Sequence, residues 1–184
     1  MSPFALLVLP RGPERAVWLR EVADRLARQG SRVGGFVQHV VDPETRARVL
    51  QRLSDGAEIP LGRRGQVRDP TLEEVHCSFV FERRAFEVAR AWLIEDAGTA
   101  DVLVIDELGK VESAREGHFE TAAWALASDL PAVVLLSVRG DQLFALADAL
   151  GLDRDAVAIL DATAPDPNLG AFVEAVGRAR QGSA

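Results

Sequence analysis

The stretch Asp101-Val-Leu-Val-Ile-Asp106-Glu107-Leu-Gly-Lys110-Val-Glu112 decides the fold class that this 184-residue sequence predicts. Its first part, Asp101 to Ile105, is an almost continuous apolar run, which is typical of a strand buried on both faces of a parallel sheet. Two adjacent carboxylates follow the run, and acidic groups in an apolar setting cost free energy unless they find partners. The pattern therefore predicts a central strand that presents acidic side chains at its carboxyl end.

Strand-like and helix-like segments alternate on both sides of this stretch. Apolar runs predict the strands, and apolar residues at helical spacing predict the helices, the first of which ends at Gly30. The expected strands are 4–9, 33–41, 101–105, 132–138 and 156–160, and the other expected helices are 83–97, 119–127, 141–150 and 169–180. This alternation predicts an α/β fold with a mainly parallel sheet and helices on both faces.

Residues 46–64 interrupt the alternation. Two short segments, 49–53 and 57–61, flank the pair Asp55-Gly56, which predicts a β-hairpin inserted at the edge of the sheet. The polar stretch from Arg63 to Pro70 predicts a solvated loop or a lid.

Length and composition favour one domain over residues 1–180, with a loose tail at 181–184. The formal charge of −7 is uneven, because residues 1–69 carry 12 Arg against 8 acids and the rest carries 9 cations against 20 acids. The acidic second half argues against nucleic acid and anionic membranes as partners. The single cysteine, Cys77, and the lack of a membrane-length apolar segment predict a cytoplasmic protein.

Ligands of such sheets bind where the parallel strands end. Four segments are expected at that edge, namely 10–16, Asp106-Glu107, 137–140 and 161–163. The functional side chains should therefore come from these segments.

The central strand supplies the candidate metal ligand, Asp106, and the candidate catalytic residues, Glu107 and Lys110. Asp106 would hold magnesium, mainly through water, and Glu107 would orient or deprotonate an attacking water, as in nucleotide hydrolysis. The competing interpretation is that Glu107 caps a turn and Asp106 ends the strand in solvent. Lys110 is the only lysine beside 20 arginines, and it would contact a phosphate, pair with Glu107 or Glu112, or lie on the surface by chance.

The segment after the first strand supplies candidates for nucleotide binding. They are Arg11, Gly12, Pro13, Glu14, Arg15 and Ala16. Backbone amides at the start of the next helix could face an anion, and the two arginines bring positive charge. However, the segment has neither the Gly-Lys nor the Ser/Thr of a standard phosphate loop, Pro13 lacks an N–H, and Glu14 would repel a phosphate. The sequence therefore predicts relaxed phosphate binding or none.

Arg139 is a further candidate for nucleotide binding, because it ends the expected strand 132–138. It would sense a terminal phosphate or simply be solvated. His39 and His118 have no second metal ligand at a readable spacing.

The segment Asp106-Glu107-Leu-Gly-Lys110-Val-Glu112, with Phe119 downstream, resembles the Asp-Glu-Ile-Gly-Lys-Met-Glu signature of the small P-loop nucleoside-triphosphatases, the cancer-related nucleoside-triphosphatase family. Residues 30–36 are similar to that family's segment after its first helix, and the hairpin at 49–61 fits its edge insertion. The resemblance covers most of residues 4–150. It implies a three-layer P-loop fold and a cytoplasmic, magnesium-dependent enzyme that hydrolyses ATP, GTP and other nucleoside triphosphates to diphosphates.

By position, the resemblance makes Asp106 the magnesium-linked acid and Glu107 the catalytic acid. It places Arg15 where the family has its phosphate-loop lysine and Ala16 where it has threonine, so the Walker A loop is degenerate. We therefore expect a nucleoside-triphosphatase-like domain that binds a nucleotide or another phosphate-bearing small molecule, with hydrolysis weak or lost. The alternatives are an inactive P-loop-fold scaffold that acts through protein partners, and a fully active enzyme with an unorthodox loop.

Overall fold

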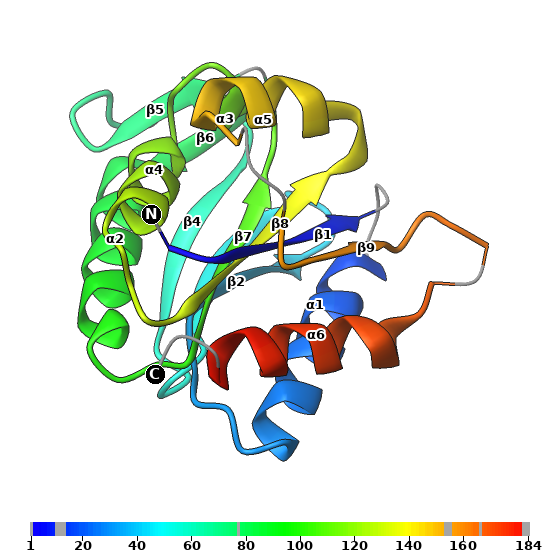
Figure 1. Ribbon diagram of the computed structural model, residues 1–184. Helices are drawn as coiled ribbons and strands as arrows, with labels where there is room; N and C mark the ends of the chain where they lie inside the picture. Colours follow the sequence, from blue (N-terminus) through cyan, green and yellow to red (C-terminus); the bar gives the residue numbers. More distant parts are fainter. Residues whose placement is uncertain (1, 10–13, 77, 153–155, 166, 182–184) are drawn as a thin grey trace.

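The computed structural model describes residues 2–9, 14–76, 78–152, 156–165 and 167–181 (Figure 1). The strands are β1 (Phe4–Leu9), β2 (Val33–Asp42), β3 (Ala47–Arg52), β4 (Glu58–Arg64), β5 (Glu73–His76), β6 (Phe79–Glu82), β7 (Val102–Leu108), β8 (Val133–Arg139) and β9 (Ala158–Asp161). The helices are α1 (Glu14–Arg28), α2 (Arg83–Ala97), α3 (Lys110–Ser113), α4 (Phe119–Ala127), the short 3-10 helix η1 (Gly140–Gln142), α5 (Leu143–Leu150) and α6 (Leu169–Gln181).

A nine-stranded sheet, in the order β5-β6-β4-β3-β2-β7-β8-β1-β9, forms the centre of the fold. The strands from β2 to β9 in this order are parallel. The strands on the other side of β2 continue the sheet in antiparallel pairs. The carboxyl ends of the parallel strands therefore meet at one edge, where ligands of such sheets bind.

Helices cover both faces of the parallel half (Figure 1). Alternate residues of β1 point into two separate cores, which explains why every position of this strand is apolar and buried. The core under α1 and α6 includes Leu7, Leu19, Val22, Val104, Phe172 and Val176. The core under α2 and α4 includes Leu6, Ala89, Leu93, Ile105, Ala122 and Leu126. The three-layer, mainly parallel α/β fold is confirmed.

The sheet extends further than the sequence predicts. The expected hairpin is present as β3 and β4, but it does not form the edge, because β6 pairs with β4 and β5 pairs with β6. These two strands were missed because each has only four residues, and β5 is mostly polar. Pairing with Phe79 of β6 also keeps Arg64 in β4, so the expected loop from Arg63 begins later.

Smaller differences lie at the ends of several elements. β7 continues to Leu108 instead of ending at Ile105, and α3 follows it, a one-turn helix too short for periodicity to reveal. Gln181 belongs to α6 rather than to the expected tail, whose other residues lie outside the described ranges. In the described part of the chain, no helix has the length and apolarity needed to cross a membrane.

Gly35 determines how closely β2 can approach β7. Its φ is +87°, and a Cβ added there would lie 2.1 Å from the carbonyl oxygen of Val104. The backbone conformation and the lack of space both favour glycine at this position. The Gly35 N–H donates to Asp96 Oδ2 at 2.8 Å, which ties the end of α2 to the same contact.

Replacing Gly35 by alanine should lower the free energy of unfolding by more than about 3 kcal/mol, because a backbone clash is added to left-handed strain. Gly56→Ala is the matched control, since Gly56 has φ +77° and nothing within 4 Å of an added Cβ. That change should cost only about 1–2 kcal/mol. Urea unfolding followed by circular dichroism measures both costs. Equal costs would mean that β2 moves away from β7 and that the close contact is not needed.

Candidate functional site

A bulge at the end of β7 turns its last residues out of the regular strand. The pairing of β7 with β8 shifts between Ile105 and Leu108, and Glu107 has φ +63°. This left-handed conformation costs free energy for any residue except glycine, so surrounding contacts must hold it in place. One such contact is the Glu107 N–H, which donates to the Ser137 hydroxyl at 2.9 Å. The bulge therefore lets Asp106 and Glu107 occupy different environments.

Asp106 lies beneath the edge of the sheet and is only 1% exposed, so it does not end the strand in solvent. Its Oδ1 accepts the Ser137 hydroxyl at 2.5 Å, and its Oδ2 accepts the Gln38 N–H at 2.8 Å. Burial raises the pKa of Asp106 above its ordinary value of 3.8, although the charge of Arg15 and the two hydrogen bonds oppose the rise. Asp106 thus joins β2, β7 and β8 at their carboxyl ends.

Glu107 is the centre of a charged cluster at the same edge. Its Oε2 accepts one ion-pair hydrogen bond from Arg15 on α1 and another, 2.6 Å long, from Arg48 on β3. The Glu107 side chain is 12% exposed, so these charges are partly screened from water and attract one another more strongly than surface charges do. The Arg48 guanidinium also lies 4.9 Å from the centre of the Phe79 ring.

Sequence reasoning missed Arg48. Its hairpin was expected, but the pairing register decides which charged residues of a hairpin lie at the carboxyl edge of the sheet. A hairpin pattern does not fix that register relative to the next strand.

Lys110 begins α3 and is exposed beside the cluster. It does not pair with Glu107, whose partners are the two arginines, or with Glu112. The Glu112 carboxylate accepts the backbone N–H groups of Gly109 and His118 at 2.8 and 3.1 Å, and burial raises its pKa. Among the described side chains, the Lys110 ammonium therefore has no partner.

Arg139 reaches the same edge from the end of β8. Its guanidinium makes two hydrogen bonds to the carboxylate of Asp141, 3.1 and 2.8 Å long. A Cβ added to Gly109 would lie 3.2 Å from Arg139 Cδ, so the arginine lies against the start of α3. The residue is near the edge as predicted, with its charge already paired.

The predicted phosphate-binding segment is described only in part. Arg11, Gly12 and Pro13 lie outside the described residues, and Glu14 and Ala16 are described only as backbone in the first turn of α1. Arg15 is the member whose side chain is described, and it binds Glu107. Phosphate binding by this segment stays a prediction.

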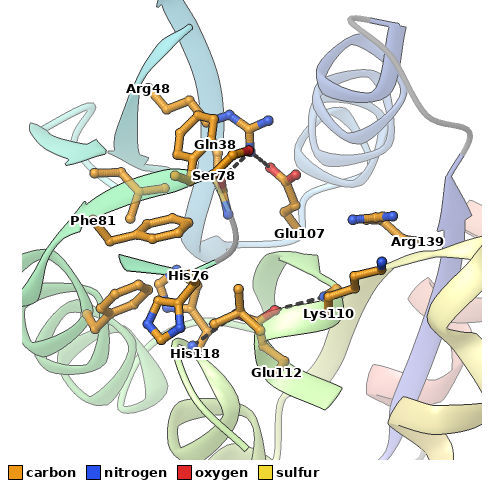
Figure 2. A pocket seen from close by; sticks show the side chains of 15 residues that line it. Gln38, Arg48, His76, Ser78, Phe81, Glu107, Lys110, Glu112, His118 and Arg139 are labelled. Carbon is orange, nitrogen blue, oxygen red and sulfur yellow. Dashed lines mark hydrogen bonds and ion pairs between the residues drawn. The ribbon is translucent and has the colours of Figure 1, made fainter. Parts of the chain in front are cut away.

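A pocket of about 300 Å³ lies between Glu107 and the β5–β6 hairpin (Figure 2). Of the predicted site residues, Glu107, Lys110 and Arg139 line it, whereas Asp106 and Arg15 do not. Figure 2 shows Phe81 on the opposite side from Lys110 and Arg139. Lining residues that the sequence analysis did not place here include Gln38, Arg48, His76, Phe79, Phe81 and His118.

His118 is an unusual residue among those that line this pocket. It is 1% exposed, and neither of its ring nitrogens has a partner among the described residues. The rings of Phe36 and Phe86 lie 4.6 and 4.9 Å from its ring centre. Burial lowers the pKa of His118 to about 3, so the imidazole is neutral near pH 7. A sequence shows a lone histidine but not whether its nitrogens find partners, so nothing in the chain could have indicated this.

Magnesium fits these side chains poorly as they lie. The ion needs open oxygen ligands and usually keeps several waters. Both oxygens of Asp106 already accept hydrogen bonds in a site that is 1% exposed. Within the described ranges, no group of three or more His, Cys, Asp or Glu side chains is arranged to hold a metal. The magnesium role of Asp106 therefore stays a prediction that the side-chain positions do not favour.

Comparison with known proteins places the chain in a family. Residues 4–148 match the model of the family described as protein of unknown function, DUF2478, and the chain belongs to that family. No protein of curated function matches the chain.

Two solved structures share the three-layer α/β fold of this chain. One is the solution structure of a human cancer-related nucleoside triphosphatase, with a TM-score of 0.68 at 22% identity over 100% of both chains. The other is the crystal structure of THEP1 from the hyperthermophile Aquifex aeolicus, with a TM-score of 0.62 at 18% identity over 86% of this chain and 88% of that chain. At such low identity the likeness establishes the fold alone.

His118 should make the protein less stable in acid. The unfolded chain binds a proton at His118 below about pH 6.5, whereas the folded chain does so only below about pH 3. The contribution of the neutral imidazole to the free energy of unfolding is therefore complete above about pH 6.5 and is lost as the pH falls. Between pH 7 and pH 5, the wild type should lose about 2 kcal/mol more unfolding free energy than His118→Phe. Urea unfolding of both proteins at several pH values measures the difference. Parallel pH curves would contradict the buried, neutral imidazole.

Proposed function

We propose that this protein binds a nucleotide, or another phosphate-bearing small molecule, at the carboxyl edge of its sheet, and that it hydrolyses nucleoside triphosphates weakly or not at all. The pairing of the Glu107 carboxylate with Arg15 and Arg48 carries this proposal. The fold it shares with a human cancer-related nucleoside triphosphatase supports the choice of ligand.

This edge carries four cations, which are Arg15, Arg48, Arg139 and Lys110. Glu107 pairs with Arg15 and Arg48, and Asp141 pairs with Arg139. Arg15 also lies in the first turn of α1, where exposed N–H groups and the helix dipole favour an anion. Phosphate oxygens would replace Glu107 Oε2 as acceptors for the two arginines.

The same pairing argues for weak hydrolysis. A general base must be within hydrogen-bonding reach of the water it activates and able to accept its proton. Glu107 Oε2 already accepts from two guanidinium groups, which hold the carboxylate and compete with a water. The loop also lacks the lysine and the hydroxyl residue of a standard phosphate loop, since Arg15 and Ala16 stand at those positions. The proposal therefore treats residues 10–16 as a degenerate Walker A loop.

ATP titration by calorimetry, with and without magnesium, tests the binding step. We expect saturable binding whose affinity changes less than about threefold on adding magnesium, because the described side chains fit the ion poorly. Phosphate release should stay below about 0.1 per second, against a median near 10 per second for enzymes, and Glu107→Gln should not lower it. No binding at millimolar ATP would favour the scaffold alternative, and rapid Glu107-dependent release would favour the fully active enzyme.

Glu107→Gln should bind ATP about three- to tenfold more tightly than the wild type, because removing one negative charge frees both arginines for phosphate. Glu21→Gln is the charge-matched control, since Glu21 pairs with Arg25 on the exposed side of α1 and should leave the affinity unchanged. Arg15→Gln should weaken binding at least about tenfold. Weaker binding by Glu107→Gln would show that the carboxylate itself is needed, and would contradict the competition proposed here.

A further inference from the structure

We infer that the pocket between Glu107 and the β5–β6 hairpin is a second ligand site, which takes one planar heteroaromatic ring with an anionic substituent. This inference goes beyond nucleotide binding at the sheet edge, because the phenylalanines of the pocket and His118 have no part in that proposal. Its observations are an aromatic wall, buried polar atoms without partners, and an unpaired cation facing that wall.

The aromatic wall is built by the second hairpin and α2. Phe79, Phe81 and Phe86 line the pocket with neighbouring ring centres 5.5 and 5.6 Å apart, and each is only partly buried. His76 continues the row, with its ring centre 5.7 Å from that of Phe81. Its two ring nitrogens lie 3.0 and 2.7 Å from carboxylate oxygens of Glu74 and Glu116, which hold the ring in place. Contact with water is unfavourable for partly exposed phenylalanines in a concave wall. Stacking on the planar ring of a ligand removes that contact and stabilises them.

The buried polar atoms without partners lie in the pocket lining or next to it. Within the described residues they are Nδ1 and Nε2 of His118, Nε of Arg48 and Nε of Arg15. His118 and Arg48 line the pocket, and Arg15 meets it through Glu107. Native proteins leave few such atoms unsatisfied, and each exception calls for a water, a ligand or a functional role. A neutral imidazole offers one donor and one acceptor, which matches the ring nitrogens and oxygens of a heteroaromatic ligand.

The anionic part of the ligand is indicated by Lys110. Arg48 pairs with Glu107 and Arg139 pairs with Asp141, so among the described cations that line the pocket the Lys110 ammonium is the unpaired one. It lies across the pocket from Phe81 (Figure 2). A ring against the phenylalanines would therefore direct a carboxylate or phosphate towards Lys110.

Size and position separate this pocket from the nucleotide edge. Its volume of about 300 Å³ is at the lower end for ligand sites, which suits a single ring and its acid better than a nucleoside triphosphate. Glu107 stands between it and α1, since Arg15 approaches the carboxylate from α1 and Arg48 approaches it from β3. A ligand in the pocket and phosphates near α1 can therefore be present together.

The test titrates the whole protein with nicotinate and with uridine 5′-monophosphate by calorimetry and by protein NMR. At least one should bind saturably, with a dissociation constant at or below about 1 mM. Binding of nicotinate would show that the site takes a carboxylate, and binding of uridine 5′-monophosphate would show that it takes a phosphate. Benzoate, which has the ring and the acid but no ring nitrogen, should bind at least about threefold more weakly than nicotinate if nicotinate is the ligand that binds.

Variants assign the binding to the pocket. Phe81→Leu should weaken it at least about fivefold, because a stacked ring is lost, and the exposed Lys110→Gln should weaken it at least about threefold. The matched controls are Phe144→Leu, at a residue 86% exposed on α5, and Arg178→Gln on α6, and both should bind as the wild type does.

ATP decides whether the site is separate. If ATP binds, saturating ATP should leave the affinity for the probe within about twofold. Displacement of the probe by ATP would overturn the inference, because the pocket would then belong to the nucleotide site. Absence of binding by both probes, or equal binding by Lys110→Gln and the wild type, would overturn it as well. Probe binding without ATP binding would overturn only the proposed nucleotide site and leave this one standing.

Discussion

The Glu107 carboxylate between two arginines is the interaction on which the functional edge depends. Arg15 comes from α1 and Arg48 from β3, so one charged group joins the parallel half of the sheet to the antiparallel half. The left-handed backbone of Glu107 and the bulge in β7 would cost free energy by themselves. The ion pairs and the bond to Ser137 offset that cost, and together they fix where the edge ends and the pocket begins.

A second constraint is the close contact between β2 and β7 at Gly35. Gly35 lets β2 lie against β7 closely enough for Asp96 to bind its backbone N–H. β2 is also the strand at which parallel pairing gives way to antiparallel pairing. The close contact therefore supports the hairpins that carry Arg48, Phe79 and Phe81 to the edge of the sheet.

In the proposed function, the edge binds a phosphate-bearing ligand and hydrolyses it weakly or not at all. Asp106 is buried and hydrogen-bonded on both oxygens, and Glu107 is held by guanidinium groups. Groups arranged in this way stabilise a charged assembly, whereas a hydrolase needs an open metal ligand and an available base. His118 and Lys110, which have no partners among the described side chains, line the pocket, and an aromatic wall faces Lys110 (Figure 2). In the two proposals, the edge therefore recognises phosphate charge and the pocket recognises a planar ring.

The sequence by itself determined the parallel half of the fold and the place of its acids. Helical periodicity predicted α2 and α4 at their observed bounds, and apolar runs predicted the strands of the parallel half, because buried strands and amphipathic helices have strong local patterns. The two acids at the tip of β7 followed from the same pattern. The short strands β5 and β6, the pairing of Arg48 with Glu107 and the unpartnered nitrogens of His118 were decided only by the tertiary structure. Each of them depends on register and on neighbours remote in the chain, and a local pattern contains no information about either.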